Sequence, residues 1–472
     1  MCTIDGDVSS LPRTQPFLPP EIWYRCFELA TYVPTSLNIS IQDPFDPSLP
    51  PSEYHFPSTD VVVQQTELRK SLPIRRSLVL VCKTWNSIAT RLLYRSLFID
   101  RTNDLSPLRS TLLASQQNVL SAGLGIEHSL GSCTRRVDIV LPSLCDNDGA
   151  MKILLEPLAD IFSCLPSLRS LFILACAGRA LRVMPDSIIN AIADTCSGTL
   201  QRICWDSEST VLPMRETYRS LLRRSKRLKT IDNGLYAWAA SCPLSMGGPQ
   251  TEEGTLQELD CLALEPWFNC NYEPTLEHDS LSSIPPPYPN LRKIILRVST
   301  VLTHHCLSHS LAIQGPIITT AYIHLTNPQA LPPTLVLLST HCPNLRHLII
   351  QLPRTLEYLP PFSVPKTVTH LGIYIDGSAS TIGFSQVFNR LAGTDRSGGE
   401  GANATEVSTG LVVRFFNSES LGFSRMRRYH GPLLAEGVNR LQAKGWIVQD
   451  WEGKALEVGL GSNWFREMGL ST

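Results

Sequence analysis

The sequence predicts an α/β protein in which a small helical module precedes a repeat solenoid, and a strand–helix–strand cap closes the array. Three observations predict this order. Residues 15–100 carry apolar side chains at helical spacing, residues 134–392 repeat one leucine phrase about every 28 positions, and residues 411–472 combine short strands with a helix. Residues 393–410 are polar and rich in glycine, and we expect a flexible loop there.

Composition excludes several classes of protein. The chain has 472 residues, of which 43% are hydrophobic and 18% charged, so it can build a large core. Its net charge of -1 argues against a nucleic-acid or membrane-surface partner. The sequence has no apolar run long enough for a membrane span and no secretory pattern in its first twenty residues. Its 14 cysteines form no CxxC pair and are expected to be reduced thiols, which suits a cytoplasmic or nuclear protein.

The first helix is expected to begin near Pro19. Proline suits a first helical turn, and Glu21 complements the positive end of the helix dipole. Pro34 ends the pattern. The apolar positions between these limits follow at steps of four, three and four, and they are Ile22, Cys26, Leu29 and Val33.

An insert at about 35–57 is polar and rich in proline, and we expect it to be an exposed loop. Helical signals resume near Asp60 and are strong from Leu78, where the spacing predicts one helix with a single apolar face. Residues 94–99 then alternate like a strand. The members of that apolar face are Leu78, Val81, Cys82, Trp85, Ile88, Ala89 and Leu92.

The repeated phrase is a loop followed by Leu-x-x-Leu-x-Leu or a near match. Each copy predicts a short strand with its leucines inward, and the stretches between copies, such as 187–194 and 216–223, predict return helices. One unit cannot bury its apolar side alone, whereas stacked units bury it at roughly 1.5–3 kcal/mol per leucine. The copies are 165–173, 199–205, 227–231, 255–262, 289–296, 317–323, 342–350 and 367–373. In the last region we expect strands at 411–416 and 446–448 and a helix at 432–444.

The first region resembles an F-box. Leu18-Pro19-Pro20-Glu21-Ile22 matches the first half of that motif, and residues 80–85 with Leu92-Leu93-Tyr94-Arg95 match the second. The repeats resemble the irregular leucine-rich repeats of F-box proteins, in a layout similar to the divergent families of mushroom-forming fungi. The resemblance implies a non-catalytic adaptor that docks Skp1, joins a cullin–RING ubiquitin ligase and holds a protein substrate on its repeats.

Carried over residue by residue, the resemblance gives a Skp1-docking face made of Leu18, Pro19, Ile22, Leu80, Val81, Cys82 and Trp85. Pro19 and Val81 are 62 positions apart, which exceeds the usual separation of the two halves. The insert must therefore loop out of the helical pack, and loop closure becomes costlier only slowly with length.

Two alternatives remain open. The apolar stripes could be the core of a helical domain without a partner, in which case the chain would be a leucine-rich-repeat scaffold that recruits no ligase. On the repeats, basic residues follow the lead leucines and could bind an acidic or C-terminal segment, or they could simply be solvated. The substrate-binding candidates are Arg169, Arg292, Arg346 and His347, with Arg202 and Lys229 in the same series.

No motif predicts catalysis. The sequence has no Walker A loop, HExxH, GxSxG or GxGxxG followed by a helix, and no spacing selects a catalytic triad or one cysteine. His304, His305, Cys306 and His309 form one dense group, but no second group accompanies it to complete a zinc site. We therefore expect a protein that is not an enzyme and needs no cofactor or metal.

Overall fold

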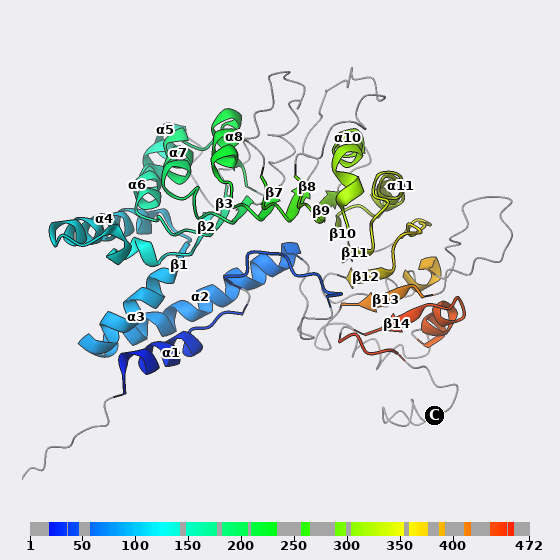
Figure 1. Cartoon of the computed structure of the whole chain (residues 1–472), viewed down its shortest axis with the longest axis horizontal. Helices are drawn as coiled ribbons and strands as arrows, with labels where there is room; N and C mark the ends of the chain where they lie inside the picture. Colours follow the sequence, from blue (N-terminus) through cyan, green and yellow to red (C-terminus); the bar gives the residue numbers. More distant parts are fainter. Residues whose placement is uncertain are drawn as a thin grey trace, which may run out of the picture.

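The structure is a computed structural model of the chain (Figure 1). It describes residues 18–34, 36–46, 57–141, 148–176, 182–205, 209–233, 256–264, 288–298, 304–353, 358–375, 387–391, 410–416, 435–450 and 452–456. The expected flexible loop at 393–410 falls almost wholly outside these ranges, which resume at Gly410.

Three helices form the amino-terminal module: α1 (Pro20–Ala30), α2 (Pro57–Val81) and α3 (Lys83–Arg95). The single helix expected across 78–92 is wrong, because the chain breaks at Cys82. Cys82 is extended, with φ -160° and ψ 169°, and its sulfur accepts the backbone N–H of Trp85, so it caps α3. A cysteine is an unusual N-cap, and helical spacing continues across it, so the sequence pattern hides the break.

Within the described residues, twelve strands form one sheet, and every strand pairs in parallel with its neighbour. The order in the sheet follows the order along the chain, and the expected strands of the last region extend the same sheet. The strands are β1 (Ser96–Ile99), β2 (Arg136–Leu141), β3 (Ser170–Ala175), β5 (Arg202–Trp205), β7 (Thr230–Asn233), β8 (Cys261–Leu264), β9 (Lys293–Val298), β10 (Thr320–Leu325), β11 (His347–Leu352), β12 (His370–Ile375), β13 (Val412–Phe415) and β14 (Ile447–Gln449). A separate pair joins β4 (Arg182–Val183) to β6 (Val211–Leu212).

Helices between the strands line up along one face of the sheet, while α1, α2 and α3 lie on the other side (Figure 1). The expected return helices at 187–194 and 216–223 are α7 and α8, and residues 435–442 are helical within the expected 432–444. The helices of the covered face are α4 (Leu105–Ser121), α5 (Asp148–Leu155), α6 (Pro157–Ser163), α7 (Asp186–Thr195), α8 (Arg215–Arg224), α10 (His304–Gln314) and α11 (Leu331–His341).

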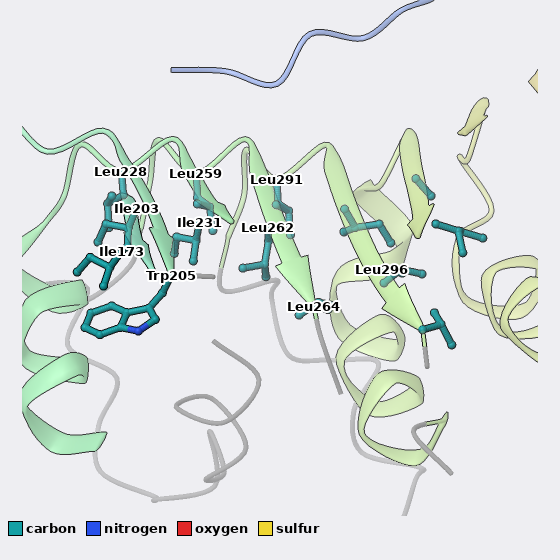
Figure 2. Packing of buried hydrophobic residues seen from close by; sticks show 14 of the residues in the cluster. Ile173, Ile203, Trp205, Leu228, Ile231, Leu259, Leu262, Leu264, Leu291 and Leu296 are labelled. Atoms are coloured by element: carbon teal, nitrogen blue, oxygen red, sulfur yellow. The ribbon is translucent and has the colours of Figure 1, made fainter. Parts of the chain in front are cut away.

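Strand alternation gives the sheet two different faces. The second residue of each of the twelve strands, and the fourth residue of most of them, belong to one continuous apolar core beneath the helices. Figure 2 shows this core as rows of side chains, with Leu228, Leu259 and Leu291 in one row and Ile231 and Leu262 in the next. The first and third residues of the strands face the other way, and many of them are polar or charged.

Candidate functional site

The helical module is held together by aromatic side chains. The rings of Trp23 and Trp85 have centroids 4.9 Å apart, and the rings of Phe27 and Trp85 are 4.7 Å apart. Phe27, Ala89 and Leu92 are buried around them. Trp85, predicted to lie on the docking face, is thus half-buried and joins α1 to α3.

The other predicted docking residues are exposed at one end of this module. Leu18 and Ile22 expose 41% and 48% of their surface, and Leu80 and Val81 expose 82% and 59%. Pro19 and Cys82 are exposed as well. The start of α1 meets the α2–α3 junction where Trp23 contacts Trp85, so the two halves of the predicted face lie at the same end (Figure 1).

This exposure follows from the break at Cys82. A continuous helix would turn Val81 and Cys82 onto the same apolar stripe as Trp85 and bury them. Because the chain is extended at Cys82, the end of α2 projects instead. Exposed apolar residues gathered at one site are typical of surfaces that bind another protein.

At the opposite end of the module, Glu28 joins α1 to α3. Its carboxylate accepts from Arg95 and from Arg25, each at 2.6 Å. The hydrogen bond from Arg95, followed by that from Arg25, lowers the pKa of Glu28 below its ordinary value. These contacts fix the direction of α1 relative to α3 without using the exposed apolar end.

The described part of the insert expected at 35–57 is a loop, but it is not exposed throughout, since Ser36, Ile41 and Phe45 are buried. Residues 36–46, which we call the crossing segment, run in an extended path across the polar face of the sheet (Figure 1). Side chains of six strands donate hydrogen bonds to its backbone carbonyls. The pairs are Arg136 with Ser36, Arg202 with Asn38, Thr230 with Ile39, Lys293 with Ile41, Tyr322 with Gln42, and Arg414 with Pro44.

Two apolar side chains anchor the crossing segment. Ile41 and Phe45 are each 7% exposed and pack on third-position strand residues that include Ile295 and Tyr322. The Phe45 ring also lies 5.0 Å from the guanidinium carbon of Arg414. The polar face attracts the segment because an extended backbone supplies carbonyl acceptors to donors that burial would otherwise leave unsatisfied.

Asp43 adds a charged contact to this path. Its carboxylate lies 2.7 Å from Nδ1 of His347 and accepts from the Thr320 hydroxyl at 2.9 Å. Burial by itself would raise the pKa of Asp43, but the hydrogen bond and charge of His347, with the Phe45 N–H and the Thr320 hydroxyl, hold it below its ordinary value. His347, a predicted substrate-binding residue, therefore contacts the chain's own crossing segment.

Arg136 connects the helical module to the sheet. Its fully buried guanidinium binds Asp138 through two nitrogens, at 2.6 and 2.8 Å, and lies 4.0 Å above the Phe172 ring. It also donates to Ser36 of the crossing segment and to Gln64 of α2. The sequence did not predict this group of contacts around Arg136. Its only sign in the sequence is that Arg136 and Asp138 occupy the first and third positions of β2.

The predicted substrate-binding arginines do not lie on a sheet face. Arg169, Arg292 and Arg346 each come one residue before a strand, and their exposed side chains lie along the edge where the strands begin. Arg202 lies one place later in its phrase and is buried beneath the crossing segment. Arg169, Arg292 and Arg346 therefore share one register at this edge, and Arg202, which lies one residue later, does not join them.

Comparisons with known proteins found no family model and no curated protein that matches this sequence. Among the helices of the described ranges, none is long and apolar enough to cross a bilayer. The side chains of His304, His305, Cys306 and His309 lie outside the described residues, although their backbone forms part of α10.

Proposed function

We propose that the chain is a substrate-recognition adaptor of a Skp1–cullin–F-box ubiquitin ligase. The observation that carries this proposal is the exposed apolar end of the helical module. Leu18 and Ile22 of the first half-motif and Leu80 and Val81 of the second are exposed there, at the end where Trp23 of α1 contacts Trp85 of α3. Interfaces of this kind depend on a few apolar or aromatic anchors. Ubiquitin transfer would belong to other subunits, and the chain itself would catalyse nothing.

The long separation of the two half-motifs is compatible with docking. The chain leaves α1 after Ala30 and enters α2 at Pro57, away from the α2–α3 junction that carries Leu80 and Val81. The crossing segment turns from the module onto the sheet, so it does not cover the exposed apolar end. The described part of the insert, residues 36–46, therefore leaves the proposed docking face open.

Consecutive parallel strands with helices returning along one face favour a leucine-rich-repeat-like solenoid as the substrate-binding part. Its polar face is occupied by the crossing segment, so we place substrate contacts on the exposed strand-start edge, which includes Arg169, Arg292 and Arg346. An acidic segment of a substrate would suit guanidinium groups at this edge.

Co-purification of the full chain with Skp1 tests the proposal. The double variant Leu80→Ala/Val81→Ala removes two exposed apolar side chains, so it should fold normally and lose at least tenfold in Skp1 affinity. Val336→Ala is the matched control, because Val336 is 63% exposed on α11, far from the module. A folded wild-type chain that does not bind Skp1 would contradict the proposal and favour a scaffold without ligase recruitment.

A further inference from the structure

A cavity of about 370 Å³ lies where the helical module meets the first strands of the sheet. Four arginines line it: Arg91 and Arg95 from α3, Arg135 before β2, and Arg169 before β3. Tyr24 of α1 and Ser170 of β3 also line it. Its volume is within the usual range for small-molecule sites.

The backbone fixes the spacing of three of these arginines. The N–H of Arg135 donates to the carbonyl of Arg95, and the N–H of Arg169 donates to the carbonyl of Arg135, both at 2.9 Å. Arg95, Arg135 and Arg169 are therefore successive rungs, about 4.8 Å apart, at the start of neighbouring strands. Arg91 lies one helical turn before Arg95 on α3 and faces the same cavity.

Little negative charge balances this group. Glu28 pairs with Arg95 at 2.6 Å, and among the described residues no carboxylate pairs with Arg91, Arg135 or Arg169. One nitrogen of Arg135 donates to the carbonyl of Ser167 at 3.0 Å. Burial lowers the pKa of Arg135. The positive charges of Arg169 and Arg95 lower it further, because like charges repel one another. A bound anion would relieve that repulsion.

The chemistry of the wall selects the class of anion. A guanidinium presents a planar fork of donors that matches the oxygens of a phosphate group, and this match favours arginine over lysine in phosphate sites. Three uncompensated arginines, spread over about two strand spacings, exceed what a single phosphate group needs. Leu37 of the crossing segment also lines the cavity.

We propose that this cavity binds a ligand that carries at least two phosphate groups, held by Arg91, Arg135 and Arg169. The site is separate from the apolar end assigned to Skp1, and its occupancy does not depend on that assignment. The ligand is either a free phosphorylated small molecule or a doubly phosphorylated segment of a protein, since both present the same groups to the arginines.

Isothermal titration of the full chain with inorganic phosphate, pyrophosphate and a peptide with two adjacent phosphoserines tests the proposal. Pyrophosphate or the peptide should bind at least tenfold more tightly than phosphate. Arg169→Ala should weaken that binding about tenfold, which is the effect of losing one charge-assisted hydrogen bond. Arg169 is exposed, so the variant should keep the melting temperature of the wild type.

Arg101→Ala is the matched control, because Arg101 is likewise exposed, follows the carboxyl end of β1, and lies outside both the cavity and the strand-start edge. Tighter binding of pyrophosphate would identify a free small molecule as the ligand, and tighter binding of the peptide would identify a phosphorylated protein. Binding of none of the three probes at millimolar concentration, or equal weakening by Arg169→Ala and Arg101→Ala, would overturn the proposal.

Discussion

At the scale of single residues, Arg136 shows how one buried charge can join three parts of a chain. It contacts Asp138 of its own strand, Gln64 of α2 and Ser36 of the crossing segment, and it is fully buried. We expect Arg136→Met to lower the free energy of unfolding by about 3–5 kcal/mol, because Asp138 would stay buried without its partner. Urea denaturation followed by circular dichroism measures the loss.

The double variant Arg136→Met/Asp138→Leu distinguishes the free-energy cost of leaving Asp138 buried without a partner from the net contribution of the ion pair to stability. Replacing both members by apolar residues removes the unpaired carboxylate, so the loss should be smaller than for Arg136→Met alone. A double variant less stable than the single one would show that the ion pair itself, and not the orphaned charge, dominates at this position.

Asp43 gives a prediction for pH dependence. The pKa of Asp43 in the folded chain is lower than its ordinary value of 3.8. The contacts of its carboxylate therefore stabilise the fold above pH 3.8, and this stabilisation is lost as the pH falls through the pKa of the folded state. Asp43→Asn should therefore cost about 1.5–3 kcal/mol at pH 7, and the difference from wild type should shrink below about pH 3.8. Thermal unfolding from pH 7 to pH 3 measures this, with the exposed Asp104→Asn as control. A difference that stays constant with pH would contradict the assignment.

At the scale of elements, the crossing segment is held by its backbone and by two apolar anchors. The Phe45 ring packs against His347, His370 and Phe416. Phe45→Ala should therefore release the carboxyl-terminal end of the crossing segment from the sheet, because large-to-small core changes of this kind cost about 3–5 kcal/mol. Limited proteolysis should cut this variant within 36–46 faster than the wild type. Gln42→Ala is the control, since its side chain is exposed and only its carbonyl binds Tyr322. Equal cleavage rates in the two variants would show that Phe45 does not anchor the segment.

The strands could be predicted because their signal is local. Each phrase places its apolar residues at strand spacing, as in β3, β9 and β11, whereas β2 lies outside the repeated phrases and was not expected from them. The crossing segment could not be predicted in this way. Its partners lie far along the chain, for example 370 positions between Pro44 and Arg414, and a segment bound through carbonyls needs no pattern of side chains.

The candidate docking face was predictable in part. The half-motifs selected Leu18, Ile22, Leu80 and Val81, all of which are exposed at one end of the module. Trp85 is half-buried between α1 and α3, and helical spacing alone cannot tell a residue that packs between helices from one that faces solvent. The arginine cavity escaped notice because its members come from one helix and two strand starts, which meet only in the folded chain.

At the scale of the whole molecule, the crossing segment changes how the sheet should unfold. In a sheet whose strands follow chain order, each strand pairs only with its neighbours, so distant parts could unfold separately. The segment adds contacts from β2 to β13 in a single stretch of chain, which should couple both ends of the sheet. The wild type should therefore unfold in one urea transition.

The double variant Ile41→Ser/Phe45→Ser tests this coupling, because it removes both apolar anchors while the sheet and its helices stay intact. We expect its urea transition to broaden or divide, with a lower m value than the wild type. Leu335→Ala in α11 is the control: it destabilises the helix-covered core and should move the midpoint while the slope stays unchanged. If both variants shift the midpoint with the wild-type slope, the segment does not couple the two ends of the sheet, and neighbour contacts alone account for its cooperativity.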